Sequence, residues 1–166
     1  MKYDAEVLSA IARVSPGLDP TLVHAIIQKE SSHGARLVTA ESGGRFSYGP
    51  MMVLDTTARG DYGIADPSSL ARDPALGIYY GVRYLVSKIA KYPGDSLSAI
   101  AAYNAGSARR ASTGGPFVNQ SYVNDVVGFW RQYRALVPAA AGAGVLLFLV
   151  VGTYLVLRSR KRVRAA

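Results

Sequence analysis

The sequence of 166 residues contains no cysteine and only two histidines, His24 and His33. Without thiols the chain has neither a disulfide framework nor a cysteine nucleophile. Neither histidine belongs to an HExxH or other paired-ligand pattern, so a zinc site has little to be built from. We therefore expect no metal and no other cofactor. The hydrophobic content of 49% is enough to build a core.

Acidic residues are also few, with eleven Asp and Glu against nineteen Lys and Arg and a net charge of +8. Five of the basic residues lie in the last nine positions, RSRKRVRAA. The other basic groups are scattered and largely balanced by acidic ones. This distribution does not indicate a nucleic-acid-binding surface in the body of the chain.

Residues 135–157 form a run of twenty-three residues without a charge, between Arg134 and Arg158. As a helix this run would be about 34 Å long, enough to cross a hydrocarbon core of about 30 Å. We predict a transmembrane helix at 135–157, a globular domain at 1–134 and a basic tail at 158–166. More basic residues follow the span than precede it, which favours a cytoplasmic tail and an exported N-terminal domain.

Helical spacing of hydrophobic residues runs through most of 1–134, and no strand pattern is evident. The first helix contains Val7, Leu8 and Ile11, and Asp19-Pro20 begins a second one that ends near Gly34. Residues 37–72 are rich in glycine and turn dipeptides and are predicted to be loops that shape a cleft. Further helices are expected at 51–59, 73–92, 95–106 and about 119–133.

Glu30 occupies a hydrophobic position of the second helix, after Leu22, Val23, Ile26 and Ile27. A carboxylate at a helix C-terminus, next to apolar side chains, is disfavoured in its charged form, so its pKa should rise. A glutamic acid that holds its proton near neutral pH suits general acid catalysis of glycosidic cleavage. From this stretch alone, a surface ion pair with a Lys or Arg at a frayed helix end is the favoured explanation of Glu30.

Four segments in order, ESSHG from Glu30, SYGPMMVLDTTA at 47–58, DPALGIYYGVRYL at 73–85 and AAYNAG at 101–106, resemble the soluble lytic transglycosylase family. The resemblance covers about residues 8–133. It implies a mainly α, lysozyme-like fold of the goose-type lysozyme/SLT kind, here followed by one C-terminal transmembrane helix. It also implies cleavage of peptidoglycan glycan strands without a cofactor.

The resemblance implies that Glu30 is the catalytic acid and that a set of residues binds substrate: Ser31, Ser47, Tyr48, Gly49, Met51, Met52, Tyr103, Asn104 and Tyr122. The family's Gly-Leu-Met-Gln segment falls on residues 49–52. Met52 stands at the glutamine position and Pro50 at the leucine position. The missing amide affects how an N-acetyl sugar is held, whereas acid catalysis through Glu30 does not need it.

The family cleaves between N-acetylmuramic acid and N-acetylglucosamine with one glutamic acid and forms a 1,6-anhydro product. A hydrolase usually needs a second carboxylate. Of the other two glutamates, Glu6 precedes the motifs and Glu41 lies in a polar loop, where we expect it to be solvated. Asp55 and Asp61 remain candidates for a lysozyme-type hydrolase, although turn or capping roles are favoured. A catalytically silent glycan-binding or structural domain is the alternative from another class.

The first residues carry Asp4 and Glu6 where a cleavable secretion signal is basic and then hydrophobic, so we predict no such signal. This suggests a protein of the virion membrane of a bacteriophage, used to penetrate the cell wall during infection. Its partners would be glycan strands, the lipid bilayer through 135–157, and anionic lipid or packaged DNA at the basic tail, with other virion membrane proteins as further candidates. The alternative is a wall-remodelling enzyme of the bacterial inner membrane, with its catalytic domain in the periplasm.

Overall fold

The computed structural model describes residues 1–137. The chain separates into two compact units, Met1–Tyr133 and Arg134–Ala166. The predicted span at 135–157 lies almost entirely outside the described residues, and the basic tail at 158–166 lies wholly outside them, so both stay predictions. Among residues 1–137, no helix is both long and hydrophobic enough to cross a membrane.

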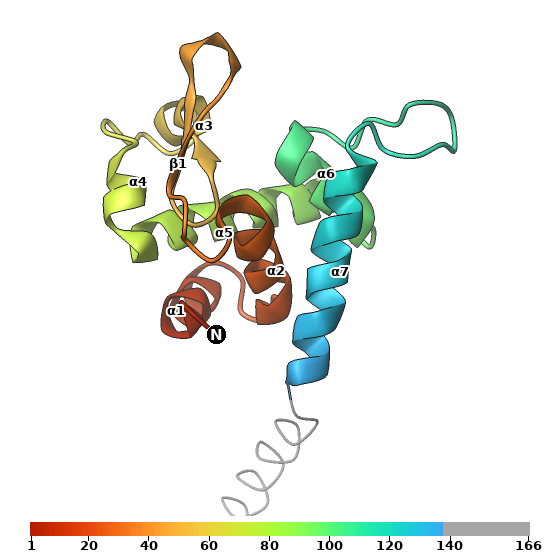
Figure 1. Ribbon diagram of the computed structural model, residues 1–166, viewed down its shortest axis with the longest axis horizontal. Coiled ribbons are helices and arrows are strands. Elements are labelled where there is room, and N and C mark those ends of the chain that lie inside the picture. The colour runs from red at the N-terminus through yellow and green to blue at the C-terminus, as the bar shows by residue number, and fades with distance from the viewer. Residues whose placement is uncertain (138–166) are drawn as a thin grey trace, which may run out of the picture. The chain divides into compact units, whose positions relative to one another are not determined.

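The described part is mainly helical, as the sequence predicts, with three short strands inserted between the second and third helices (Figure 1). The helices are α1 (Asp4–Val14), α2 (Pro20–Ser31), α3 (Asp55–Gly60), α4 (Ser69–Arg72), α5 (Pro74–Lys91), α6 (Ser96–Ala105) and α7 (Gln120–Leu136). The strands are β1 (Val38–Ala40), β2 (Phe46–Tyr48) and β3 (Val53–Leu54), with a 3-10 turn, η1 (Ser42–Gly44), between the first two.

Aspartate caps begin three of the helices. The Asp19 side chain accepts a hydrogen bond from the Thr21 backbone N–H at 2.9 Å, and Asp73 and Asp95 act in the same way on the first turns of α5 and α6. Each carboxylate satisfies an N–H that has no partner within the helix, and its charge suits the positive end of the helix dipole. The predicted starts of α2 and α5 are therefore confirmed.

The core is built around α2, which lies near the middle of the first unit in Figure 1. All residues from Thr21 to Ile27 are buried, so α2 is covered on every side and not only along one stripe. α1 packs on α2 and α5, and it contributes Val7, Ala10 and Ile11 to the core. The predicted first helix is confirmed, and Leu8, which also belongs to it, is 57% exposed.

The three strands correct the prediction that 37–72 contains only loops and a short helix. They form an antiparallel sheet in the order β1-β2-β3, with Thr39 opposite Ser47 and Tyr48 opposite Val53. Strands of two or three residues are too short for an alternating pattern to be recognised in a sequence. The turn between β1 and β2 contains Gly43 and Gly44, both with positive φ, a conformation that favours glycine.

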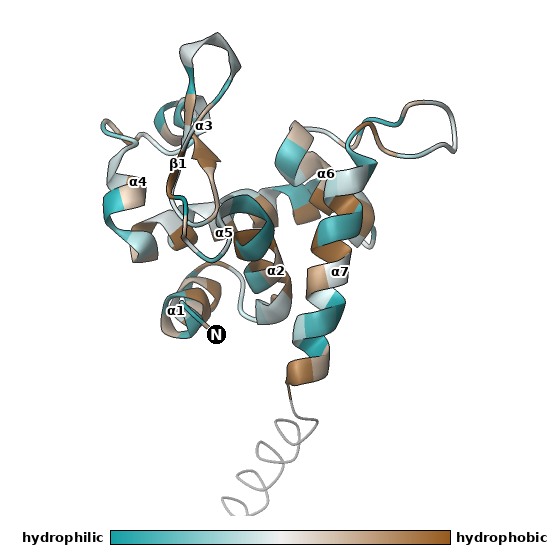
Figure 2. Ribbon diagram, in the orientation of Figure 1, coloured by the Kyte–Doolittle hydropathy of each residue, from teal (hydrophilic) through white to brown (hydrophobic). Residues whose placement is uncertain are grey.

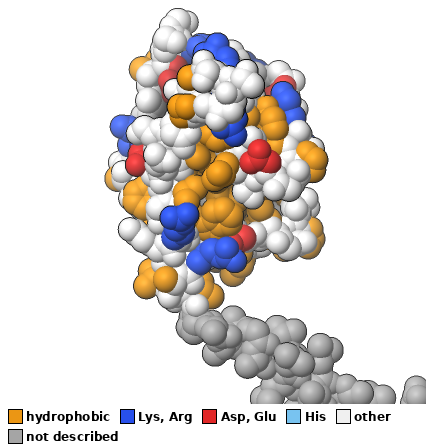
Figure 3. Space-filling model, turned by 90° about the vertical axis from the view of Figure 1, so that its right-hand side faces the viewer, with side chains coloured by type: hydrophobic (Ala, Val, Ile, Leu, Met, Phe, Trp, Pro, Cys, Tyr) orange, Lys and Arg blue, Asp and Glu red, His pale blue; other side chains and the backbone are white. Residues whose placement is uncertain are grey.

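α7 is amphipathic over its length, with hydrophobic and hydrophilic residues alternating along the ribbon in Figure 2. Its buried residues are Tyr122, Val123 and Val126, which join the core shared with α2 and α6. On the face of the molecule that carries α6 and α7, hydrophobic side chains gather in a central band with charged side chains beside it (Figure 3). Helical packing thus brings residues of α7 next to the end of α2.

Candidate active site

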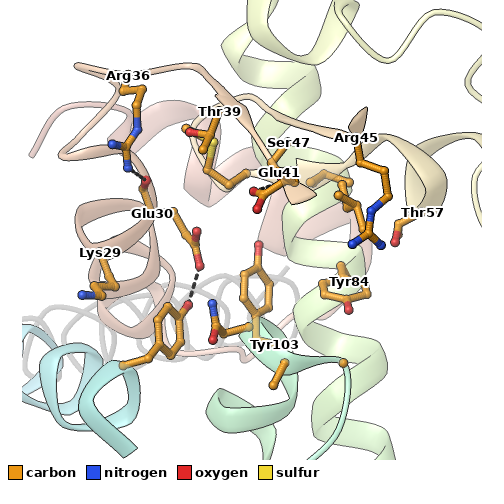
Figure 4. Close-up of a pocket in the computed structure, with 17 residues that line it drawn as sticks. Lys29, Glu30, Arg36, Thr39, Glu41, Arg45, Ser47, Thr57, Tyr84 and Tyr103 are labelled. Atoms are coloured by element: carbon orange, nitrogen blue, oxygen red, sulfur yellow. Dashed lines mark hydrogen bonds between the residues drawn. The ribbon is translucent and has the colours of Figure 1, made fainter. Parts of the chain in front are cut away.

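A cleft of about 610 Å³ lies between the C-terminal end of α2, the sheet and the helices α6 and α7 (Figure 4). Its lining combines Glu30 with five of the other residues expected at the site: Ser47, Met52, Tyr103, Asn104 and Tyr122. These residues come from the strand β2, the loop before β3, and the helices α6 and α7. Helical packing therefore assembles the cleft from segments far apart in the chain.

Glu30 lies in the last turn of α2, and its Oε1 accepts a hydrogen bond of 2.6 Å from the Tyr122 hydroxyl. Burial raises the pKa of this carboxyl from 4.5 to about 7, against the lowering effect of the Tyr122 hydrogen bond. The negative charge of Glu41 raises this pKa as well, whereas Lys29 and Arg36 lower it. The predicted rise of the pKa is confirmed, with burial as its principal cause.

Two buried tyrosines stand beside the acid. Tyr122 is 7% exposed and Tyr103 is 5% exposed. Burial raises the pKa of both hydroxyls well above the ordinary value, so both keep their protons and act as hydrogen-bond donors at neutral pH. The Tyr103 hydroxyl donates to the Met51 carbonyl at 2.7 Å, which ties α6 to the segment below the sheet.

Asn104 is exposed in the cleft and is oriented by a residue that the sequence reasoning missed. The Asn119 side-chain amide donates to the Asn104 side-chain oxygen at 2.9 Å and to the Ala101 carbonyl at 3.0 Å. This contact occupies the carbonyl end of the Asn104 amide. Asn104 can therefore offer its NH2 group as a hydrogen-bond donor in the cleft. Asn119 lies just before α7, and nothing in its local sequence marks it for this role.

Four of the predicted binding residues do not line the cleft. The Ser31 hydroxyl is buried 2.8 Å from the Pro50 carbonyl oxygen and 3.1 Å from that of Ile27, and it accepts a hydrogen bond from the Gly34 N–H. Ser31 thus fastens the segment after β2 to the end of α2. Tyr48 packs instead in a second hydrophobic cluster, formed around Val53, Ala58 and Leu70.

Gly49 and Met51 support the cleft from behind. A Cβ on Gly49, which has φ +85, would lie 2.7 Å from the Leu70 carbonyl oxygen. Met51 is fully buried against Gly81, where a Cβ would lie 2.4 Å from the Met51 Cβ. Met52 is the member of this segment that lines the cleft, and its φ of +48 turns the chain toward β3.

Glu41 also lines the cleft, which the sequence reasoning did not anticipate. Glu41 is exposed, as expected, but its Oε1 accepts a hydrogen bond of 2.8 Å from the buried Ser47 hydroxyl. In Figure 4 the labelled Glu41 and Glu30 side chains extend into the same space from opposite walls. The position of Glu41 in the cleft could have been predicted only from the hairpin, because β1 and β2 bring residue 41 beside residue 47.

Asp55 and Asp61 do not line the cleft. Asp55 accepts a hydrogen bond from the Thr56 N–H at 2.7 Å and pairs with Arg59 at 3.6 Å, as a residue at the start of α3 would. Asp61 directly follows α3, in the C-cap position. The two positions agree with the capping and turn roles favoured from the sequence.

The fold and site together define a small helical domain whose cleft centres on one glutamic acid that is protonated near neutral pH. The model of the transglycosylase SLT domain family matches residues 8–121. This is more than half of the chain, and the protein belongs to that family. The family consists of lytic transglycosylases, so the chain carries an enzyme domain of the peptidoglycan-degrading type.

Proposed function

We propose that this protein is a lytic transglycosylase that cleaves the β-1,4 bond between N-acetylmuramic acid and N-acetylglucosamine, with Glu30 as its catalytic acid and base. The observation that carries the proposal is the position of Glu30 in the cleft, with its pKa raised to about 7. A carboxyl with this pKa is available in both protonation states at neutral pH, as a residue that first donates and then accepts a proton must be.

The hydrogen bond from Tyr122 distinguishes the two oxygens of Glu30. Oε1 accepts from the tyrosine hydroxyl, which leaves Oε2 to carry the transferable proton. In the first step this proton passes to the glycosidic oxygen as the bond to the muramic C1 breaks. In the second step the carboxylate takes the proton of the muramic C6 hydroxyl, whose oxygen bonds to C1. Glu30 regains its proton, and no water is consumed.

The other cleft residues suit the binding of a sugar chain. The free NH2 group of Asn104 can donate to a carbonyl or hydroxyl oxygen. The half-buried Tyr84 offers ring surface, and the buried Tyr103 ring packs against it with the ring centroids 5.2 Å apart. Met52 supplies an apolar contact at the position where the family has glutamine. We propose that this change weakens the hold on an N-acetyl group and leaves proton transfer by Glu30 intact.

A second candidate is favoured by one observation, which is the presence of Glu41 in the cleft. A hydrolase of the lysozyme type needs a second carboxylate to activate water or to act as nucleophile. If Glu41 has this role, the products carry reducing ends instead of anhydro ends. A catalytically silent glycan-binding domain remains the alternative outside the enzyme class, with Met52 as the feature in its favour.

Digestion of purified peptidoglycan by the full chain, followed by mass analysis of the fragments, separates these candidates. The proposal predicts anhydro-muropeptides that disappear in Glu30→Gln and persist in Glu6→Gln, a control on α1 outside the cleft lining. Reducing ends that depend on Glu41 would establish the hydrolase instead. Binding of glycan without any cleavage would establish the silent domain.

We further propose that residues 135–157 anchor the enzyme in a membrane with the catalytic domain on the side away from the basic tail. The charge difference across this segment supports the orientation. The virion membrane of a bacteriophage is the proposed location, where the enzyme penetrates the wall during infection. Immunolabelling of purified particles tests the location. If the protein is absent from the particles and is recovered in the bacterial inner membrane, the cellular alternative is favoured.

A further inference from the structure

Three basic side chains line the cleft, and two of them form no ion pair with any residue that the structure describes. Lys29 pairs with Asp125 at 2.6 Å. By contrast, neither Arg36 nor Arg45 has a carboxylate within ion-pair distance among residues 1–137. Both arginines are exposed, and both line the cleft. Two guanidinium groups thus face the space that the substrate occupies.

Arg45 is held in place by the turn between β1 and β2. The Glu41 N–H donates to the Arg45 carbonyl at 2.8 Å and closes this turn. The Arg45 Nε donates to the Ser42 carbonyl at 3.1 Å, and its Nη2 lies 3.4 Å from the Ser42 hydroxyl. These contacts use one edge of the guanidinium. Within residues 1–137 no hydrogen bond uses the two Nη1 hydrogens or the second Nη2 hydrogen, and these form the fork that can bind a carboxylate with two parallel hydrogen bonds.

Arg36 and Arg45 lie on different sides of the cleft. Figure 4 shows Arg36 beside the backbone of Glu30, where its Nη2 is 3.4 Å from the Glu30 carbonyl oxygen, and Arg45 near Thr57. Only three residues separate Glu41 from Arg45, but the Glu41 Oε1 accepts from Ser47, and among residues 1–137 no carboxylate forms an ion pair with Arg45. The positive charge of Arg45 is therefore available at the Thr57 end of the cleft.

In a peptide-substituted strand the sugars are uncharged, because the lactyl carboxyl group of muramic acid is bound to the peptide as an amide. The carboxylates of this polymer lie on the peptides attached to the lactyl group of muramic acid. We propose that Arg45, with Arg36 as a weaker second contact, binds a carboxylate of this peptide, so that the cleft prefers strands whose peptide carboxylates are free. This inference rests on the proposed function and adds the acidic peptide as a recognised part of the substrate.

A comparison of two substrates tests the inference: glycan strands whose peptides have free carboxylates, and the same strands after these carboxylates have been amidated. The wild-type chain should show a higher kcat/KM on the strands with free carboxylates. In Arg45→Gln the ratio of the two kcat/KM values should fall about tenfold, the effect expected from losing one partly exposed charge-assisted hydrogen-bond pair. Arg59→Gln is the matched control, because Arg59 is an exposed arginine of α3 outside the cleft lining and should leave the ratio unchanged.

A binding measurement in the Glu30→Gln background tests the same contact without cleavage. Fragments with free peptide carboxylates should bind more tightly than fragments whose carboxylates are amidated, and adding Arg45→Gln should remove the difference. Equal affinity for the two fragments, or an unchanged difference in the double variant, would overturn the inference. If wild-type chain binds in this manner but produces no anhydro ends, the proposed function fails while the peptide contact stands.

Discussion

Replacing Glu30 by glutamine should stabilise the folded protein, and the gain should grow with pH. The pKa of the Glu30 carboxyl is about 7 in the folded protein, against 4.5 as the ordinary value of a glutamate side chain. The folded state therefore binds this proton more tightly than the unfolded state. Its stabilising effect is fully present below pH 4.5 and is lost as pH rises through about 7. Glutamine has no charge to bury, and its side-chain oxygen can still accept the hydrogen bond from Tyr122.

The magnitude follows from the difference between the two pKa values. At 1.36 kcal/mol per pKa unit, the change from 4.5 to about 7 corresponds to at most about 3 kcal/mol. Urea unfolding of the wild type and of Glu30→Gln at pH 4 and pH 9, chosen to bracket both values, measures this directly, because other titrating groups cancel in the comparison. The difference in unfolding free energy should increase by about 2–3 kcal/mol between these two pH values. A difference that stays constant would refute the reasoning that burial keeps Glu30 protonated.

Three further predictions concern neighbours of the site and the stability of the fold. Tyr122→Phe removes a bond that lowers the pKa of Glu30, so the loss of activity at alkaline pH should move to higher pH, which a kcat/KM profile detects. Gly81→Ala places a Cβ against Met51 and should cost about 1–3 kcal/mol in urea unfolding, and equal stability would show that the packing adapts. Burial lowers the pKa of His24 below 6.5, so stability should fall as pH drops through 6.5, and His24→Gln should reduce that fall in thermal unfolding; an unchanged slope would contradict it.

Local signals were sufficient to predict the longer helices, whereas α4 was missed and the predicted helix at 51–59 includes β3. Asp19-Pro20 and Asp73-Pro74 mark helix starts because capping depends only on a side chain and the N–H groups of the next turn. The interrupted hydrophobic pattern marked Glu30 as unusual, and the four segments that resemble the family then indicated it as the catalytic acid. Burial then raises its pKa in the direction that the pattern predicts.

The remaining features depend on contacts between distant segments. Ser31 follows Glu30 in sequence, yet its hydroxyl turns away from the cleft to the Pro50 carbonyl, 19 residues further on. Adjacent methionines likewise separate, with Met51 in the core and Met52 in the cleft, because of the positive φ at Met52. Glu41 reaches the cleft only through a hairpin whose strands are too short to be predicted from their residues.

The central claim is that Glu30 holds a proton near neutral pH, and a titration of its carboxyl tests this most directly. The sequence contains only three glutamates, so NMR of protein labelled at the glutamate carboxyl carbon gives few signals, and Glu30→Gln identifies the one of interest. The structure predicts that this signal titrates with a midpoint of about 7. A midpoint near 4.5 would contradict the account, because Glu30 would then be ionised before it meets the glycosidic oxygen.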